Sequence, residues 1–166
     1  MLVVEGEATV DDVDAFVAEL GDIGDEYGVA VQAFDARYVV GRAHLEQAVR
    51  LANRATERGE TIARDRAVEI LLYAAGRRQI NRALEMGVDE GTTPAVVVVD
   101  GTGEDADEAG ATAAVEDLLT PASTLGEYDC ERVLAWFDIS ETELAATDGD
   151  LEDIVCERVA LLTVDR

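Results

Sequence analysis

The chain of 166 residues carries 37 acidic side chains against 13 basic ones, a formal charge of −24, and 48% of its residues are apolar. That length fits one domain spanning residues 1–166, and the apolar content is too high for a disordered acidic chain. No apolar run approaches the roughly 20 residues of a membrane-spanning helix, and no basic, apolar signal segment opens the sequence, so we expect a cytoplasmic protein.

The first third of the chain alternates β-branched runs with amphipathic segments. Val3–Val10 is predicted as a strand, and the acidic residues after it favour the first turn of a helix that ends at Gly28. Val29–Phe34 is predicted as a second strand. The segment Arg42–Arg58 has the spacing of a helix, with Gly59 at its carboxyl end.

The rest of the chain is mainly helical around one more strand. A helix is predicted over Asp65–Ala75, and after the break at Gly76 another runs from Arg77 to Gly87. The β-branched run Pro94–Asp100 is typical of a buried strand. Beyond an acidic loop, further helices are expected near Ala111–Leu119, Asp129–Phe137, Ser140–Thr147 and Leu151–Leu162. Strands and helices in this order indicate an α/β protein of the α+β type in a single domain.

The acidic residues are spread over nearly every segment, and all 13 basic residues are arginine. Two interpretations stand: a specific acidic surface that binds a partner, or adaptation to high salt, in which carboxylates keep the chain hydrated and soluble. The even spread and the absence of lysine favour adaptation. We therefore treat most carboxylates as solvent-facing background.

The segment 37–82 departs from that background, because it holds ten of the arginines and only five acidic residues, a net charge of +5. Either these arginines pair with the acidic remainder of the protein, or they form a face that binds anions. Surface ion pairs contribute little and are screened by salt, so we favour the anion-binding face.

Catalytic chemistry is poorly supplied. The single histidine, His44, is typical of a packed histidine, and neither Ser123 nor Ser140 lies in a nucleophile elbow. The two cysteines, Cys130 and Cys156, have no metal or redox spacing. The acidic loop 101–110 lacks the calcium-loop pattern and its glycines lack the dinucleotide fingerprint. We expect no enzyme, no cofactor and no metal.

Three stretches carry a resemblance: Asp35–Ala48 (DARYVVGRAHLEQA), Glu69–Ile80 (EILLYAAGRRQI) and Leu151–Val164 (LEDIVCERVALLTV). Through them the chain resembles the small regulatory, kinase-binding subunit of the KEOPS complex, and its acidity suggests a haloarchaeal-like member. The resemblance implies a small mixed sheet packed with several helices. It also implies a non-catalytic subunit of the machinery that makes N6-threonylcarbamoyladenosine in tRNA, docking on a kinase-like ATPase subunit and binding the single-stranded 3′ CCA end of tRNA. The alternative is an adaptor between proteins that binds no RNA.

We predict the RNA site at the break after Gly76, where a helix starting at Arg77 would present free backbone N–H groups and a positive dipole end. Two adjacent arginines there repel each other unless an anion lies between them, although pairing with Glu69 or Glu85 is the alternative. The predicted RNA-binding residues are Arg64, Arg66, Arg77, Arg78, Gln79 and Arg82. Gln79 would either read a base edge or only be hydrated.

The final helix carries the predicted partner site. Its stripe of aliphatic residues would ordinarily pack into the protein's own core, and the resemblance instead places this helix on the kinase-facing surface. The predicted partner-binding residues are Leu151, Ile154, Val155 and Arg158.

Overall fold

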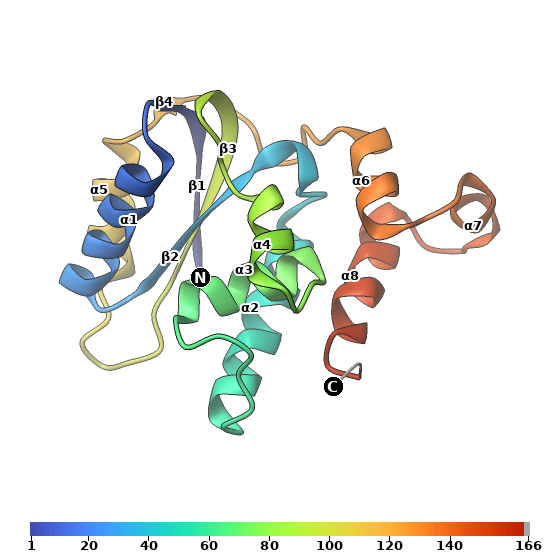
Figure 1. The fold of residues 1–166 in the computed structure, drawn as a ribbon, viewed down its shortest axis with the longest axis horizontal. Helices are drawn as coiled ribbons and strands as arrows, with labels where there is room; N and C mark the ends of the chain where they lie inside the picture. Colours follow the sequence, from blue (N-terminus) through green and yellow to red (C-terminus); the bar gives the residue numbers. More distant parts are fainter. Residues whose placement is uncertain (165–166) are drawn as a thin grey trace.

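A four-stranded sheet lies at the centre of the computed structural model, which describes residues 1–164 (Figure 1). Its strands stand in the order β2-β3-β1-β4, and their bounds are β1 (Leu2–Val10), β2 (Ala30–Asp35), β3 (Gly91–Asp100) and β4 (Thr120–Pro121). Each pair of neighbouring strands is antiparallel, which corrects the mixed sheet that the resemblance implied. β1 and β2 run in the same direction, but β3 lies between them, so they never pair. The α+β class is confirmed.

The sheet has a separate core on each face, because the side chains of β3 alternate between the two sides. Val97 and Val99 pack on one side, and Val96 and Val98 pack on the other. All four are fully buried, as the apolar run predicts for a central strand.

Helices α1 (Val13–Tyr27) and α5 (Glu108–Glu116) cover the first face, on the left in Figure 1. Asp12 caps α1 by accepting a hydrogen bond from the backbone N–H of Ala15, and Gly28 ends it in the left-handed conformation. α5 begins earlier than predicted because Asp107 caps it, accepting from the N–H of Gly110 at 2.9 Å.

The opposite face is covered by α2 (Arg42–Glu57) and α3 (Arg66–Ala75), with α8 (Leu151–Leu161) packed against both. Beyond them in Figure 1 lie α6 (Cys130–Phe137) and the small helix α7 (Glu141–Ala146). The larger core therefore joins the sheet to the carboxyl-terminal helices in one cluster.

The connection between α3 and β3 differs from the predicted helix over 77–87. Gly76 turns the chain at φ +64°, and the N–H of Arg77 donates back to the carbonyl of Leu72 at 3.1 Å, which closes α3. The next helix, α4, spans only Ile80–Ala83, and the 3-10 turn η2 (Leu84–Met86) follows it. A second 3-10 turn, η1 (Ala36–Tyr38), and the short strand β4 were not predicted.

Candidate nucleic-acid interface

The arginines of the basic segment 37–82 divide into a paired group and an unpaired group. Arg37 pairs with Asp35 at 2.7 Å, Arg42 with Glu46 at 2.8 Å, and Arg66 with Asp100. Within residues 1–164, no carboxylate forms an ion pair with the other seven, which are Arg50, Arg54, Arg58, Arg64, Arg77, Arg78 and Arg82. The pairing interpretation therefore holds for three of these arginines, and an anion-binding face would have to be built from the unpaired group.

Four of the six predicted RNA-binding residues gather around one shallow pocket of about 260 Å³. We call it the arginine pocket, and it is lined by Gly76, Arg77, Arg78, Gln79, Arg82 and Leu162. Arg78, Gln79 and Arg82 are exposed. Neither Glu69 nor Glu85 forms an ion pair with these arginines. Glu69 is turned inward, where its carboxylate accepts hydrogen bonds from the backbone N–H groups of Ile62 and Ala63.

Arg77 has a packing role that sequence reasoning missed. Its guanidinium lies 4.6 Å from the ring centre of Trp136 and donates a hydrogen bond to the backbone carbonyl of the same residue. The indole N–H of Trp136 in turn donates to the carbonyl of Ala75 at 2.9 Å. Arg77 therefore fastens the end of α3 to α6, and only part of its guanidinium remains for a ligand.

The electrostatics of the arginine pocket favour an anion. Burial lowers the pKa of Arg77, and the nearby positive charge of Arg82 lowers it further. The negative charge of Glu85 raises this pKa but only partly offsets the other two effects. Two guanidinium groups thus repel each other across a site that holds no paired carboxylate. An anion placed between them would remove that repulsion and could accept their hydrogen bonds.

The predicted reason for an anion site at this position was wrong, even though the side chains do gather there. Arg77 is not the first residue of a helix, and its N–H is already bonded to Leu72. α4 begins at Ile80 and has four residues, too few for a strong dipole. The pocket therefore depends on guanidinium groups and not on a helix end.

Arg66 and Arg64 do not line the arginine pocket. Arg66 is partly buried, where it donates to the side chain and carbonyl of Asp100 and to Asn53, and so ties α3 and α2 to the end of β3. Arg64 is exposed in the loop before α3. The structure thus brings together Arg77, Arg78, Gln79 and Arg82 but not the other two.

A second basic hollow of about 320 Å³ lies beside α2, and sequence reasoning did not connect it with the first. It is lined by Leu51, Arg54, Ala55, Arg58, Glu60, Tyr73 and Thr163. Thr163 follows directly after Leu162 of the arginine pocket, so both hollows meet the end of α8. The four-residue spacing of Arg50, Arg54 and Arg58 places them along one face of α2, but nothing local predicts that the end of α8 lies beside Arg54 and Arg58.

The predicted partner residues of α8 are turned toward the interior. Leu151, Ile154 and Val155 are buried in the larger core. Arg158 pairs with Glu143 at 2.7 Å and donates to the carbonyl of Phe137 at 3.2 Å, so it ties α8 to α7 and α6. A partner that approaches α8 in this conformation meets the other side of the helix.

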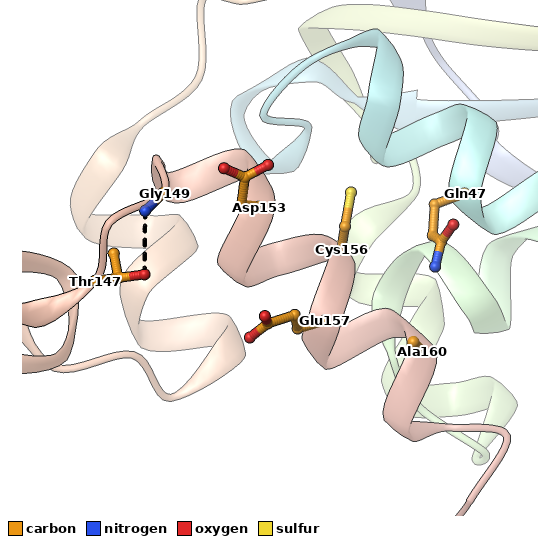
Figure 2. Close-up of a pocket in the computed structure, with 7 residues that line it drawn as sticks. All are labelled: Gln47, Thr147, Gly149, Asp153, Cys156, Glu157 and Ala160. Carbon is orange, nitrogen blue, oxygen red and sulfur yellow. Dashed lines mark hydrogen bonds between the residues drawn. The ribbon is translucent and has the colours of Figure 1, made fainter.

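That outer side borders a hollow of about 490 Å³ between α8 and α2, shown in Figure 2. We call it the α2–α8 hollow, and it is lined by Gln47, Thr147, Gly149, Asp153, Cys156, Glu157 and Ala160. Burial raises the pKa of the Cys156 thiol to about 11, with Glu152 and Asp153 adding to the effect. The cysteine is therefore an uncharged, weakly reactive lining group.

The buried titratable groups have structural roles. His44 is fully buried, its Nδ1 accepts from the N–H of Val40 at 3.4 Å, and its Nε2 lies 2.8 Å from the carbonyl of Ala74. Burial lowers its pKa to about 4, so the ring is neutral at pH 7 and donates to Ala74. This agrees with the packed histidine predicted from the sequence. Among residues 1–164 no three metal-binding side chains are grouped, and none of the helices there could span a bilayer.

Comparison with known proteins adds one finding. The family model described as kinase binding protein CGI-121 matches residues 15–163, which is nearly the whole chain. No curated protein matches the sequence significantly. The matched range includes the arginine pocket, the second basic hollow and α8 alike.

Proposed function

Because the chain belongs to the family of CGI-121 kinase binding proteins, we propose that it is a non-catalytic subunit of a KEOPS complex, docking on the kinase-like ATPase subunit and holding the 3′ CCA end of tRNA. In this role it helps to recruit tRNA for the synthesis of N6-threonylcarbamoyladenosine. The family membership supports the kinase partner. The RNA part is supported by the resemblance noted in the sequence and by the arginine pocket.

The RNA proposal rests on a cluster of cationic side chains that form no ion pair with any carboxylate among residues 1–164, in a chain of charge −24. Because the protein surface is this acidic, its long-range electrostatic interaction with RNA is weakly attractive at most and can be repulsive. Binding therefore has to come from close contacts. Guanidinium groups provide these, since they bind phosphates bidentately and stack on unpaired bases. The exposed Arg78 and Arg82 would supply most of the contact, with Arg54 and Arg58 on the next phosphates.

Charge-reversal variants test the RNA site. Arg78→Glu and Arg82→Glu are each expected to weaken tRNA binding at least tenfold at matched KCl, as measured by fluorescence anisotropy, with an unchanged melting temperature. Arg42→Glu is the matched control, because Arg42 is exposed, carries the same charge and lies outside both hollows. If all three variants bind tRNA as the parent does, the arginine pocket is not the RNA site and the adaptor alternative is favoured.

We infer that the kinase-like subunit meets the outer side of α8 at the α2–α8 hollow. Ala160 and Cys156 give this surface an apolar centre, and Asp153 and Glu157 give it an acidic border. Ala160→Arg is expected to prevent co-purification with the ATPase subunit while leaving the fold intact. Ala18→Arg, on the exposed side of α1, is the control and should co-purify normally. Equal co-purification of both variants would remove α8 from the interface.

A further inference from the structure

β2 is an edge strand of the sheet, and no strand of residues 1–164 lies beside one of its two edges. Its residues pair only with β3, in the register Val31 opposite Val99 and Ala33 opposite Val97. In an antiparallel ladder, alternate residues direct their N–H and C=O groups away from the partner strand. The open edge of β2 therefore carries backbone groups that the sheet itself does not bond.

Two observations identify which residues point outward. The carbonyl of Ala33 accepts a hydrogen bond from the side-chain amide of Gln32 at 2.8 Å and would lie 3.9 Å from a Cβ on Gly87, outside the sheet. The carbonyl of Val29 would lie 2.7 Å from a Cβ on Gly24 of α1, also outside. Alternation then directs the N–H and C=O of Val31 outward between them.

A groove follows this edge from Val29 to Ala33. It is formed by two adjoining hollows of about 570 and 490 Å³, which share lining residues of α1, β2 and the start of α3. One wall is α1, with Val13, Val17 and Leu20, and the facing wall includes Val68 and Leu84. Val31 and Ala33 form part of the floor and are only 6% and 3% exposed. Outward backbone groups of buried residues ordinarily have hydrogen-bond partners. The carbonyl of Ala33 already accepts from Gln32, whereas the outward N–H and C=O of Val31 form no hydrogen bond within residues 1–164 and are the groups left for an added strand.

The walls of the groove are apolar and its border is acidic. Val17 and Leu84 are 54% and 55% exposed, unusually high for large aliphatic side chains. The carboxylates that border the two hollows are Asp14, Asp25, Asp65, Glu85 and Asp89. Arg66 is the one basic lining residue, and its charge is already paired with Asp100.

We propose that this groove, the β2-edge groove, binds an extended segment of a partner protein that adds to β2 as a fifth strand. The outward N–H and C=O of Val31 can form hydrogen bonds with a peptide backbone, and the apolar walls can pack against a short β-branched run. The acidic border attracts lysine or arginine residues on either side of that run. A phosphate backbone fits poorly here, because five carboxylates would repel it. The proposal goes beyond the binding of tRNA and kinase and does not depend on either.

The test uses the peptide acetyl-Arg-Arg-Val-Thr-Val-Thr-Val-Arg-Arg-amide and ¹⁵N-labelled full-length protein. Titration followed by NMR is expected to shift the amide signals of Val31 and Ala33 together with those of the groove walls. Two N-methylated peptides then examine the strand geometry, one methylated on the three valines and one on the two threonines. Only alternate residues of an added strand bond to β2, so one methylated peptide is expected to lose at least tenfold in affinity and the other to bind nearly as before.

Substitutions in the walls complete the test. Val17→Lys and Leu84→Lys are each expected to weaken the peptide at least tenfold, whereas Leu161→Lys on α8, at a side chain that is 49% exposed, is the matched control and should have no effect. The proposal is overturned if 1 mM peptide leaves the Val31 and Ala33 signals unmoved, or if both methylated peptides bind equally. It is also overturned if an RNA oligonucleotide ending in CCA moves those two signals and the peptide does not.

Discussion

Arg77 was predicted to bind RNA, but in the structure its side chain packs on Trp136 and joins the end of α3 to α6. Its substitution should therefore lower the stability of the fold. Arg77→Ala removes the guanidinium from the Trp136 ring, 4.6 Å from its centre, and from the Trp136 carbonyl. A cation–π contact of this kind contributes about 0.5–2 kcal/mol. A hydrogen bond from a charged donor contributes about 1.5–3 kcal/mol. We expect the free energy of unfolding to fall by about 2–4 kcal/mol, given that the site is partly exposed.

Thermal unfolding followed by circular dichroism measures this loss. At about 2–4 °C per kcal/mol for a chain of this size, Arg77→Ala should melt at least about 4 °C below the parent. Arg78→Ala is the matched control, since it removes the same charge from an exposed neighbour and should cost no more than about 0.5 kcal/mol. Arg77→Lys keeps the charge but loses the planar fork, so it should fall between the two. Equal melting temperatures for Arg77→Ala and Arg78→Ala would refute the fastening.

Four further predictions follow from the charge and burial of other groups. Raising KCl from 0.1 M to 2 M should raise the melting temperature, because salt screens the self-repulsion of a chain of charge −24, and a flat or falling melting temperature would contradict this. The histidine of the unfolded chain is protonated below about pH 6.5, whereas buried His44 stays neutral down to about pH 4. As the pH falls from 6.5 to 4, the free energy of unfolding of the parent should therefore decrease by roughly 3 kcal/mol through this group. Urea unfolding of the parent and of His44→Gln over this pH range measures that difference. Glu69→Ala leaves the N–H groups of Ile62 and Ala63 unbonded in a buried site, at about 1–3 kcal/mol each, and trypsin should then cleave the neighbouring loop faster; unchanged cleavage would count against it. Ile154→Arg should yield unfolded protein, because it buries an unpaired charge, and a native circular dichroism spectrum would be the opposite result.

The sequence predicts the regular elements well, because their signals are local. The β-branched run before Asp100 and the capping residues Asp12 and Asp65 act within a few residues, so the helices and strands they indicate are found within a few positions of the expected bounds. The prediction of a helix beginning at Arg77 was wrong, because the helix begins at Ile80. A left-handed Gly76 closes α3, but nothing in the next three residues predicts that no new helix begins until Ile80.

The candidate site was only partly predictable, because it depends on which long-range neighbour each arginine meets. Arg77 and Arg78 are identical and adjacent in sequence, yet one packs on Trp136 and the other is exposed. Arg66 meets Asp100 because the first residue of α3 lies beside the last residue of β3, a contact between residues 34 positions apart in the chain. For the same reason, the spacing of the aliphatic residues on α8 could not show whether they face the core or a partner. In the structure Leu151, Ile154 and Val155 are buried in the larger core.

Binding of tRNA at its 3′ end is tested by comparing the affinity of the protein for tRNA with and without the CCA end. Wild-type protein is titrated into labelled intact tRNA and into the same tRNA shortened by its three terminal nucleotides, at matched KCl. We expect the shortened tRNA to bind at least tenfold more weakly, because the guanidinium groups of the arginine pocket would lose the unpaired phosphates and bases they contact. Equal affinity for the two tRNAs, or no binding of either, would contradict it.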